Sequence, residues 1–214
     1  MLRPVRPNST YIGTVTVNTS PALINLKLFV NSKARVNQDP IIPIWHRWIK
    51  DKVLDEVLID VADYRHVHQG PGVMLIAHDA NYCLDEAEDH TGLLYSAKRS
   101  VTGSLTEQLR RAFDKTLKAA ELLEQATAGS RALIFSASPL LLRVHSRIVT
   151  GTTADERGAF QLDLESALGT LFPQQRVLSR SAGSEREPLG VLLTLDPAAQ
   201  DVRGLRAQAN LEAC

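Results

Sequence analysis

Apolar and polar residues alternate with the two-residue period of β-strands through most of the first hundred residues, with one helical interruption. Segment 22–30 combines this alternation with a continuous apolar run, which predicts a strand in the core. Within 40–52, isoleucines and tryptophans recur three or four residues apart, which predicts a short amphipathic helix anchored by its tryptophans. The same two-residue pattern predicts further strands at 10–17, 57–64, 73–82 and 92–97.

The second half of the chain begins with the clearest helical pattern. Apolar residues between Leu105 and Leu123 share one face of a helix, and charged residues fill the other face. Ser104 and Glu107 have the spacing of a capping box, and Gly129 is placed to end the helix. The sequence therefore predicts one long amphipathic helix between these two signals.

Strands and a second helix follow. A strand on each side of Ser138–Pro139 is expected, because proline cannot donate a hydrogen bond to a β-ladder. A helix is expected after a second capping box at Thr153 and Glu156. The expected ranges are 132–135 and 140–149 for the interrupted strand, 153–172 for the helix, and 177–178 and 189–195 for the last strands.

Together these elements predict an α+β protein with a mostly antiparallel sheet and two or three helices packed on it. The order of elements after 104 repeats the order before it, which suggests two halves of ferredoxin-like (split β-α-β) type that meet near 100–104. We expect one α+β domain over 21–195, preceded by an N-terminal segment, 1–20, that holds the possible edge strand. Residues 196–214 are expected to form a frayed or disordered C-terminal tail.

The composition narrows the classes of function. Of the 214 residues, 44% are hydrophobic, which is ordinary for a globular protein. The 24 basic and 24 acidic residues balance, so no overall field attracts nucleic acid. No segment approaches the roughly 18 apolar residues of a membrane-spanning helix. The two cysteines form no C-x-x-C pair, which fits a reducing compartment. From these features together we expect a soluble, cytoplasmic protein without nucleic-acid or membrane partners.

Candidate chemistry gathers between residues 58 and 98, which hold four of the six histidines. Gly70-Pro71-Gly72 predicts a tight turn between the strands at 57–64 and 73–82, because proline presets one backbone angle and glycine accepts the positive angles of a reversal. These two strands are then antiparallel neighbours. Their register is open, and a slip of one residue decides which side chain lies opposite His78.

In one register Asp63 lies opposite His78, so that the carboxylate can orient the imidazole as a general base. In the other register Tyr64 lies there and shares a face with His66, His68 and His78, which form a candidate shell for a divalent transition metal. Such histidines also occur without a metal at exposed hairpin ends, so the spacing favours neither register.

His78 and Asp79 are the strongest catalytic candidates, together with Asp63. They follow the apolar run 73–77, and a buried strand that turns abruptly polar often delivers its end to a cleft. In the alternative interpretation Asp79 caps the strand end and His78 bonds a buried carbonyl. His90, by contrast, is expected in a solvated loop.

A basic face is predicted further along the chain. Arg143, His145 and Arg147 alternate with apolar residues on the strand at 140–149, so their side chains point to the same side. Such a face can bind a phosphate, a carboxylate or an acidic partner. More often it is the solvated side of an outer strand.

Phosphate-loop, dinucleotide-binding, nucleophile-elbow and zinc-protease motifs are all absent from the sequence, which disfavours nucleotide hydrolysis, dinucleotide redox chemistry and serine hydrolysis. Two functions remain. The first is a soluble α+β binding or assembly module, with a protein partner or a second copy of itself, and with a small-molecule ligand as a further option. The second is a small metal-dependent or acid/base enzyme with its site at the end of the 57–82 hairpin.

Overall fold

The computed structural model describes the chain over residues 22–32, 36–68, 70–87, 90–100, 102–129, 133–146, 154–182 and 189–211. The predicted strand at 10–17 and the candidate residue Arg147 lie outside these segments. Within them, no helix combines the length and the apolar character needed to span a bilayer.

Strands and helices occur in an order close to the predicted one. The first half contains β1 (Ala22–Val30), α1 (Ile41–Asp51), β2 (Leu58–Asp63), β3 (Val73–Ala77), β4 (Ala80–Asp85) and β5 (Gly92–Ala97). The second half contains α2 (Leu105–Thr127), β6 (Phe135–Ser146), α3 (Ala154–Leu171), β7 (Arg176–Ala182), β8 (Leu189–Asp196) and α4 (Val202–Gln208).

All eight strands join one sheet in the order β2-β3-β4-β5-β1-β6-β8-β7, and every neighbouring pair is antiparallel. The predicted α+β class with a mostly antiparallel sheet is therefore confirmed. β1 and β6 are central neighbours, and each is the first strand of one half of the chain. β6, α3 and β7 have the outline of a split β-α-β unit, because β8 lies between the parallel strands β6 and β7. A complete ferredoxin-like half needs a further strand after the second helix, so that comparison stays a prediction.

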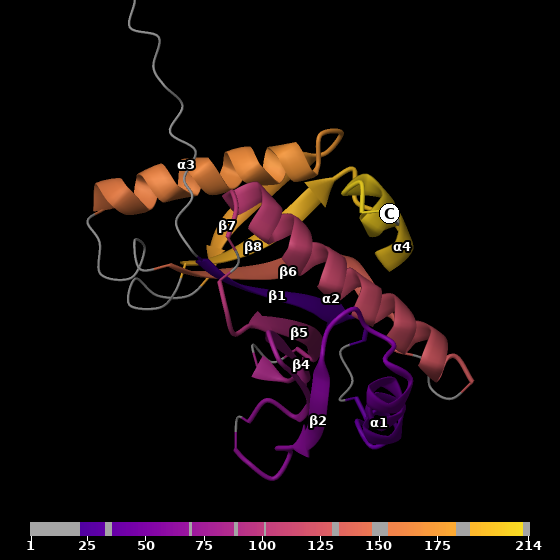
Figure 1. Ribbon diagram of the computed structural model, residues 1–214. Coiled ribbons are helices and arrows are strands. Elements are labelled where there is room, and N and C mark those ends of the chain that lie inside the picture. Colours follow the sequence, from indigo (N-terminus) through magenta and orange to yellow (C-terminus); the bar gives the residue numbers. More distant parts are fainter. Residues whose placement is uncertain are drawn as a thin grey trace, which may run out of the picture.

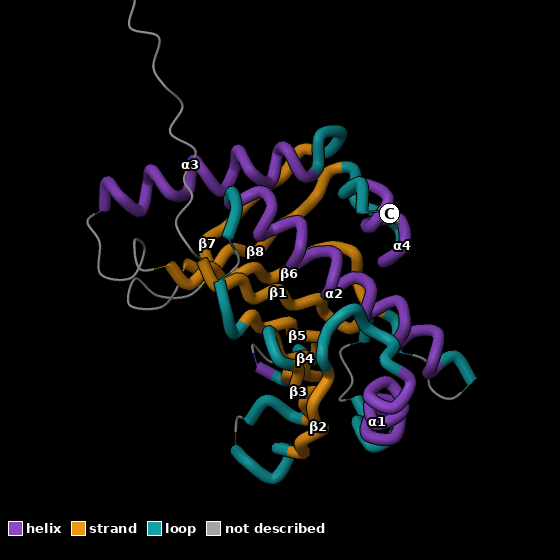
Figure 2. The backbone as a smooth tube through the Cα atoms, in the orientation of Figure 1, coloured by secondary structure: helices purple, strands orange, loops and turns teal. Residues whose placement is uncertain are grey.

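The two faces of the sheet differ in what covers them. Side chains at the even positions of β1 join a single hydrophobic core together with the buried faces of α1, α2, α3 and α4. Figures 1 and 2 show these helices gathered along one side of the sheet. Phe29, Cys83 and Leu141 are buried but lie outside that core, on the opposite side. We call this opposite side of the sheet the second face.

Helix α2 follows from its sequence as predicted. The Ser104 hydroxyl accepts a hydrogen bond from the Glu107 backbone N–H at 3.3 Å, and the Glu107 carboxylate accepts one from the Ser104 backbone N–H at 2.7 Å. These bonds satisfy two backbone donors that a helix start leaves open, and they hold the pKa of Glu107 below its usual range. The capping box thus sets where the helix begins.

The predicted strand at 73–82 is two strands. The chain reverses at His78 and Asp79, and β3 pairs with β4 through Ile76 opposite Asn81. Apolar residues continue through both strands because one face of each is buried in the core. The two-residue alternation therefore predicted one strand where the structure has two.

The predicted break at Ser138–Pro139 is also corrected. β6 continues through both residues, and its pairing with β1 jumps from Leu140 opposite Leu28 to Phe135 opposite Val30. Residues 136–139 therefore bulge opposite Phe29 alone. A bulge is a position where a proline without an N–H is tolerated within a sheet.

The C-terminal segment is more ordered than the frayed or disordered tail that we predicted. The Asp201 carboxylate accepts a hydrogen bond from Gly204 N–H at 2.7 Å and begins α4. Val202 and Leu205 of this helix are fully buried, and Arg206 bonds Asp114 and Glu121 of α2. Two apolar residues, one turn apart, dock this short helix, which is why its periodicity in the sequence is weak.

Replacing Leu205 by alanine tests this docking. We expect the free energy of unfolding to fall by about 2–5 kcal/mol, because the change leaves a cavity between α4 and the core. Arg203, on the exposed side of the same helix, supplies the control, and Arg203→Ala should change stability by less than about 0.5 kcal/mol. Urea denaturation measures both. Equal stability of the two variants would mean that α4 is not packed as described.

Candidate functional site

A buried ion pair lies at the centre of the second face. The fully buried Lys27 ammonium of β1 donates hydrogen bonds to the Asp85 carboxylate at 2.6 Å and to the Ala87 carbonyl at 2.7 Å. Gly92 lies close to this lysine, and a Cβ there would approach its Cε to 2.8 Å. Glycine is therefore required at this position for the ammonium to cross from β1 to the end of β4.

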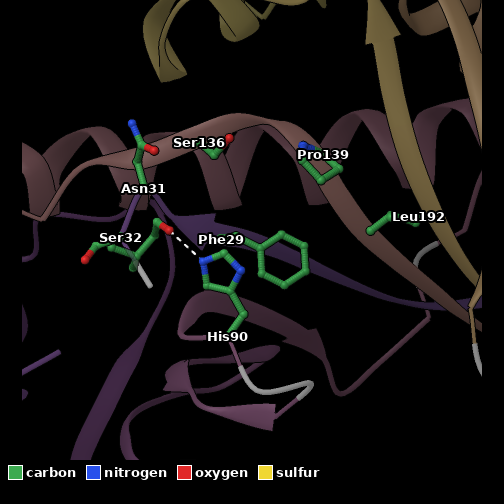
Figure 3. Close-up of a pocket in the computed structure, with 8 residues that line it drawn as sticks. Phe29, Asn31, Ser32, His90, Ser136, Pro139 and Leu192 are labelled. Carbon is green, nitrogen blue, oxygen red and sulfur yellow. Dashed lines mark hydrogen bonds between the residues drawn. The ribbon is translucent and has the colours of Figure 1, made fainter. Parts of the chain in front are cut away.

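A cleft of about 540 Å³ opens beside this ion pair. Phe29 and Val30 contribute from the end of β1, Pro139 from the bulge of β6, and Leu192 from β8 (Figure 3). The described residues that line the cleft are Phe29, Val30, Asn31, Ser32, His90, Ser136, Pro139 and Leu192. Most of this surface is apolar, and its volume falls within the roughly 300–1,000 Å³ of typical small-molecule sites.

The β6 bulge and the end of β1 create the hollow. Beyond Phe29, Val30 N–H donates to the Thr91 carbonyl at 2.9 Å on one side of the chain, and Asn31 N–H donates to the Ile134 carbonyl at 2.7 Å on the other. The irregular part of the pairing here is the stretch 136–139 of β6 opposite Phe29. Bulges are often found at positions where a sheet presents side chains to a ligand.

His90 forms one wall of the cleft. Its ring stacks on Phe29 with centroids 5.0 Å apart and an angle of 28° between the planes. Its Nε2 lies 2.9 Å from the Val30 carbonyl. Because a carbonyl only accepts, Nε2 must carry a proton in this contact. His90 lies in the predicted loop between β4 and β5, where it is half-buried and held by these two contacts.

Two serines, Ser32 and Ser136, line the cleft, and the hydroxyl of Ser136 is engaged within the bulge. It donates to the Ser138 carbonyl at 2.6 Å across the bulge. The described residues that line the cleft include no lysine, arginine, aspartate or glutamate. They offer aromatic and aliphatic surface with a few neutral polar groups.

Comparison with protein-family models gives no match for this chain, and comparison with curated proteins gives none either. What the site can do is therefore derived from its own geometry.

The predicted catalytic residues lie away from this cleft. His78 Nδ1 and Asp79 Oδ1 are 2.8 Å apart at the turn between β3 and β4, with side chains 49% and 59% exposed. Asp63 lies at the far end of β2, where it pairs with Val73. The structure thus brings His78 and Asp79 together on the surface and keeps Asp63 apart from them.

Neither predicted hairpin register occurs. Pairing of Asp63 with Val73 leaves residues 64–72 as a loop, which Tyr64 N–H closes by donating to the Gly72 carbonyl at 2.9 Å. Gly72 has φ of 71°, and the Gln38 side chain lies so close that a Cβ on this glycine would approach its Oε1 to 2.7 Å. Gly72 is therefore needed for its positive φ and for this close approach of Gln38, rather than for the predicted tight turn.

The histidines of the metal hypothesis are spread over this region. His66 and His68 are exposed in the 64–72 loop, whereas His78 lies at the next turn of the chain. Among the described residues, no group of three or more histidine, cysteine, aspartate or glutamate side chains is placed to hold a metal ion. The spacing H-x-H is present in the sequence, but a third ligand is not brought to it.

The basic face on β6 is partly preserved. His145 is half-buried on the second face, and its Nε2 lies 3.2 Å from the Asn25 side-chain nitrogen. Burial, reinforced by the neighbouring Arg143, lowers the pKa of His145 below its usual value. A neutral imidazole here weakens the predicted anion site of Arg143, His145 and Arg147.

A second buried polar cluster lies on the helix-covered side. Tyr82 donates a short hydrogen bond to the Glu56 carboxylate, and Lys115 of α2 donates to the same oxygen at 3.1 Å. Burial, together with the neighbouring Glu56 carboxylate, raises the pKa of Tyr82 far above its usual value. The cluster ties the segment after α1 to α2 and β4, and its residues do not line the cleft.

Breaking the central ion pair should be costly. Lys27→Met leaves the Asp85 carboxylate buried without its ammonium, and we expect the free energy of unfolding to fall by about 3–5 kcal/mol. Lys27→Met/Asp85→Leu removes both charges and should be more stable than the single variant. Chemical denaturation of the two variants measures the difference. A double variant that is no more stable than Lys27→Met would contradict this coupling.

A salt bridge in the 64–72 loop makes a prediction about Asp63. Its carboxylate accepts two hydrogen bonds from the Arg65 guanidinium, which lower the pKa of Asp63 to about 2. Arg65→Ala should raise this pKa toward the ordinary value of 3.8, as followed by NMR titration of the carboxyl carbon. Arg99→Ala, far from Asp63, is the control. An unchanged titration in Arg65→Ala would show that the loop is held differently.

Proposed function

We propose that this protein is a binding module for a small, uncharged and largely apolar molecule, which occupies the cleft at the end of β1. The observation that carries this proposal is the chemistry of the cleft lining. Phe29, Pro139 and Leu192 supply aromatic and aliphatic surface, and none of the described residues that line the space carries a carboxylate, an ammonium or a guanidinium group. A charged ligand would lose its hydration there without gaining a counter-charge.

The same lining favours binding over catalysis. Hydrolytic or transfer chemistry requires a nucleophile held against a base, or a metal. The Ser136 hydroxyl donates to a backbone carbonyl, and the proton on His90 Nε2 is likewise committed to a carbonyl. These groups shape the site and are not arranged to transfer a proton between themselves. Of the two functions suggested by the sequence, the binding module is therefore the one that we propose.

Indole is a suitable probe because it is planar, uncharged and small enough for the cleft. We expect its addition to shift the NMR amide signals of Phe29, His90 and Leu192 in a saturable way. Leu192→Trp fills the cleft from a half-buried position, and it should weaken the binding of indole by about tenfold or more, which corresponds to ~1.4 kcal/mol. Phe29→Ala, which removes the aromatic floor, should also weaken binding.

Leu162→Ala is the matched control, since it truncates an exposed leucine of α3 that does not line the cleft. This variant should bind indole as the unmodified protein does. Thermal unfolding of each variant shows that the fold is retained. Absence of saturable shifts at the cleft, or binding that is indifferent to Leu192→Trp, would overturn the proposed function.

A further inference from the structure

The hydrogen bond from His90 to Val30 determines what the other ring nitrogen can do. With the proton on Nε2 held by the carbonyl, the neutral imidazole has an unprotonated Nδ1 that can only accept a hydrogen bond. Within the described segments no hydrogen bond to Nδ1 is formed. Figure 3 shows this nitrogen on the side of the ring that faces Phe29, within the group of side chains that line the cleft. The wall of an otherwise apolar site thus carries a fixed acceptor.

The position of the ring is fixed as well as its tautomer. Stacking on Phe29 fixes the plane of the imidazole, and the bond to Val30 fixes its rotation within that plane. An acceptor held in this way loses little conformational freedom when a ligand donates to it. It also leaves a polar atom without a partner if the ligand that covers it has no donor, which is a basis for discrimination.

We infer that the cleft selects planar aromatic heterocycles that carry one N–H donor, and that this donor bonds His90 Nδ1. This inference rests on the proposed function, because it names the class of ligand for the same cleft. The flat apolar part of the ligand packs against Phe29, Pro139 and Leu192, and its N–H meets the imidazole acceptor whose orientation the Val30 carbonyl sets. His90 is here a specificity-determining residue and takes no part in a reaction.

Indole and 1-methylindole test the inference directly, because they differ only in whether the ring nitrogen carries a hydrogen or a methyl group. The unmodified protein should bind indole about tenfold more tightly than 1-methylindole, by NMR titration or calorimetry. His90→Phe keeps a ring to stack on Phe29 but removes the acceptor, so its preference should fall to about one. His90→Gln keeps a donor for the Val30 carbonyl and an acceptor oxygen, and should retain part of the preference.

The outcomes separate the two proposals. Equal binding of both compounds to the unmodified protein, with binding still weakened by Leu192→Trp, would overturn the role of His90 and leave the binding cleft in place. A preference that persists unchanged in His90→Phe would also overturn it, since another group would then be the acceptor. No binding of either compound at the cleft would overturn the proposed function itself. If His90→Phe fails to fold, the ratio in the unmodified protein and in His90→Gln decides.

Discussion

The buried ammonium of Lys27 is the constraint on which the second face of the sheet depends. A charge in the middle of a central strand is tolerated only with an opposite charge and further acceptors beside it. Asp85 and the Ala87 carbonyl supply these, and they come from the end of β4 and the segment that follows it. That segment must therefore fold back over β1. The same course brings His90 onto the ring of Phe29, so the wall of the cleft is a consequence of neutralising the lysine.

Covering the sheet with helices on one side only creates the conditions for this arrangement. The even positions of β1 face the core under α2, and they could be predicted from the sequence because every one of them is apolar. The odd positions, among them Lys27 and Phe29, belong to the second face, where charged and apolar side chains lie side by side. α2 could likewise be predicted almost to the residue, since its capping box and its apolar stripe are local signals. Local periodicity therefore recovered the α+β class and most strands.

What the sequence did not reveal depends on contacts between distant segments. The hairpin register is set by Arg65, which bonds Asp63 and, from the other side, Asp39, and by Gln38, which accepts the Val73 N–H. Gln38 and Asp39 lie outside 57–82, so the sequence of that segment gives no indication of them. The bulge at 136–139 and the wall at His90 are similar cases, because each is defined by what lies opposite Phe29. A lysine within a strand that is apolar apart from Asn25 was the signal, present in the sequence, that could have led to the site.

The histidines differ in how firmly the structure holds their side chains, which neither their number nor their spacing indicates. His66, His68 and His78 have the suggestive spacing but lie in exposed turns, where water competes for every bond they form. His90 has no motif, yet one nitrogen is held by a backbone carbonyl and the ring is held by an aromatic neighbour. Specific recognition requires that a polar atom be fixed before the ligand arrives, since ordering it afterwards costs affinity. By that criterion we propose the cleft beside Lys27, rather than the hairpin, as the binding site of this molecule.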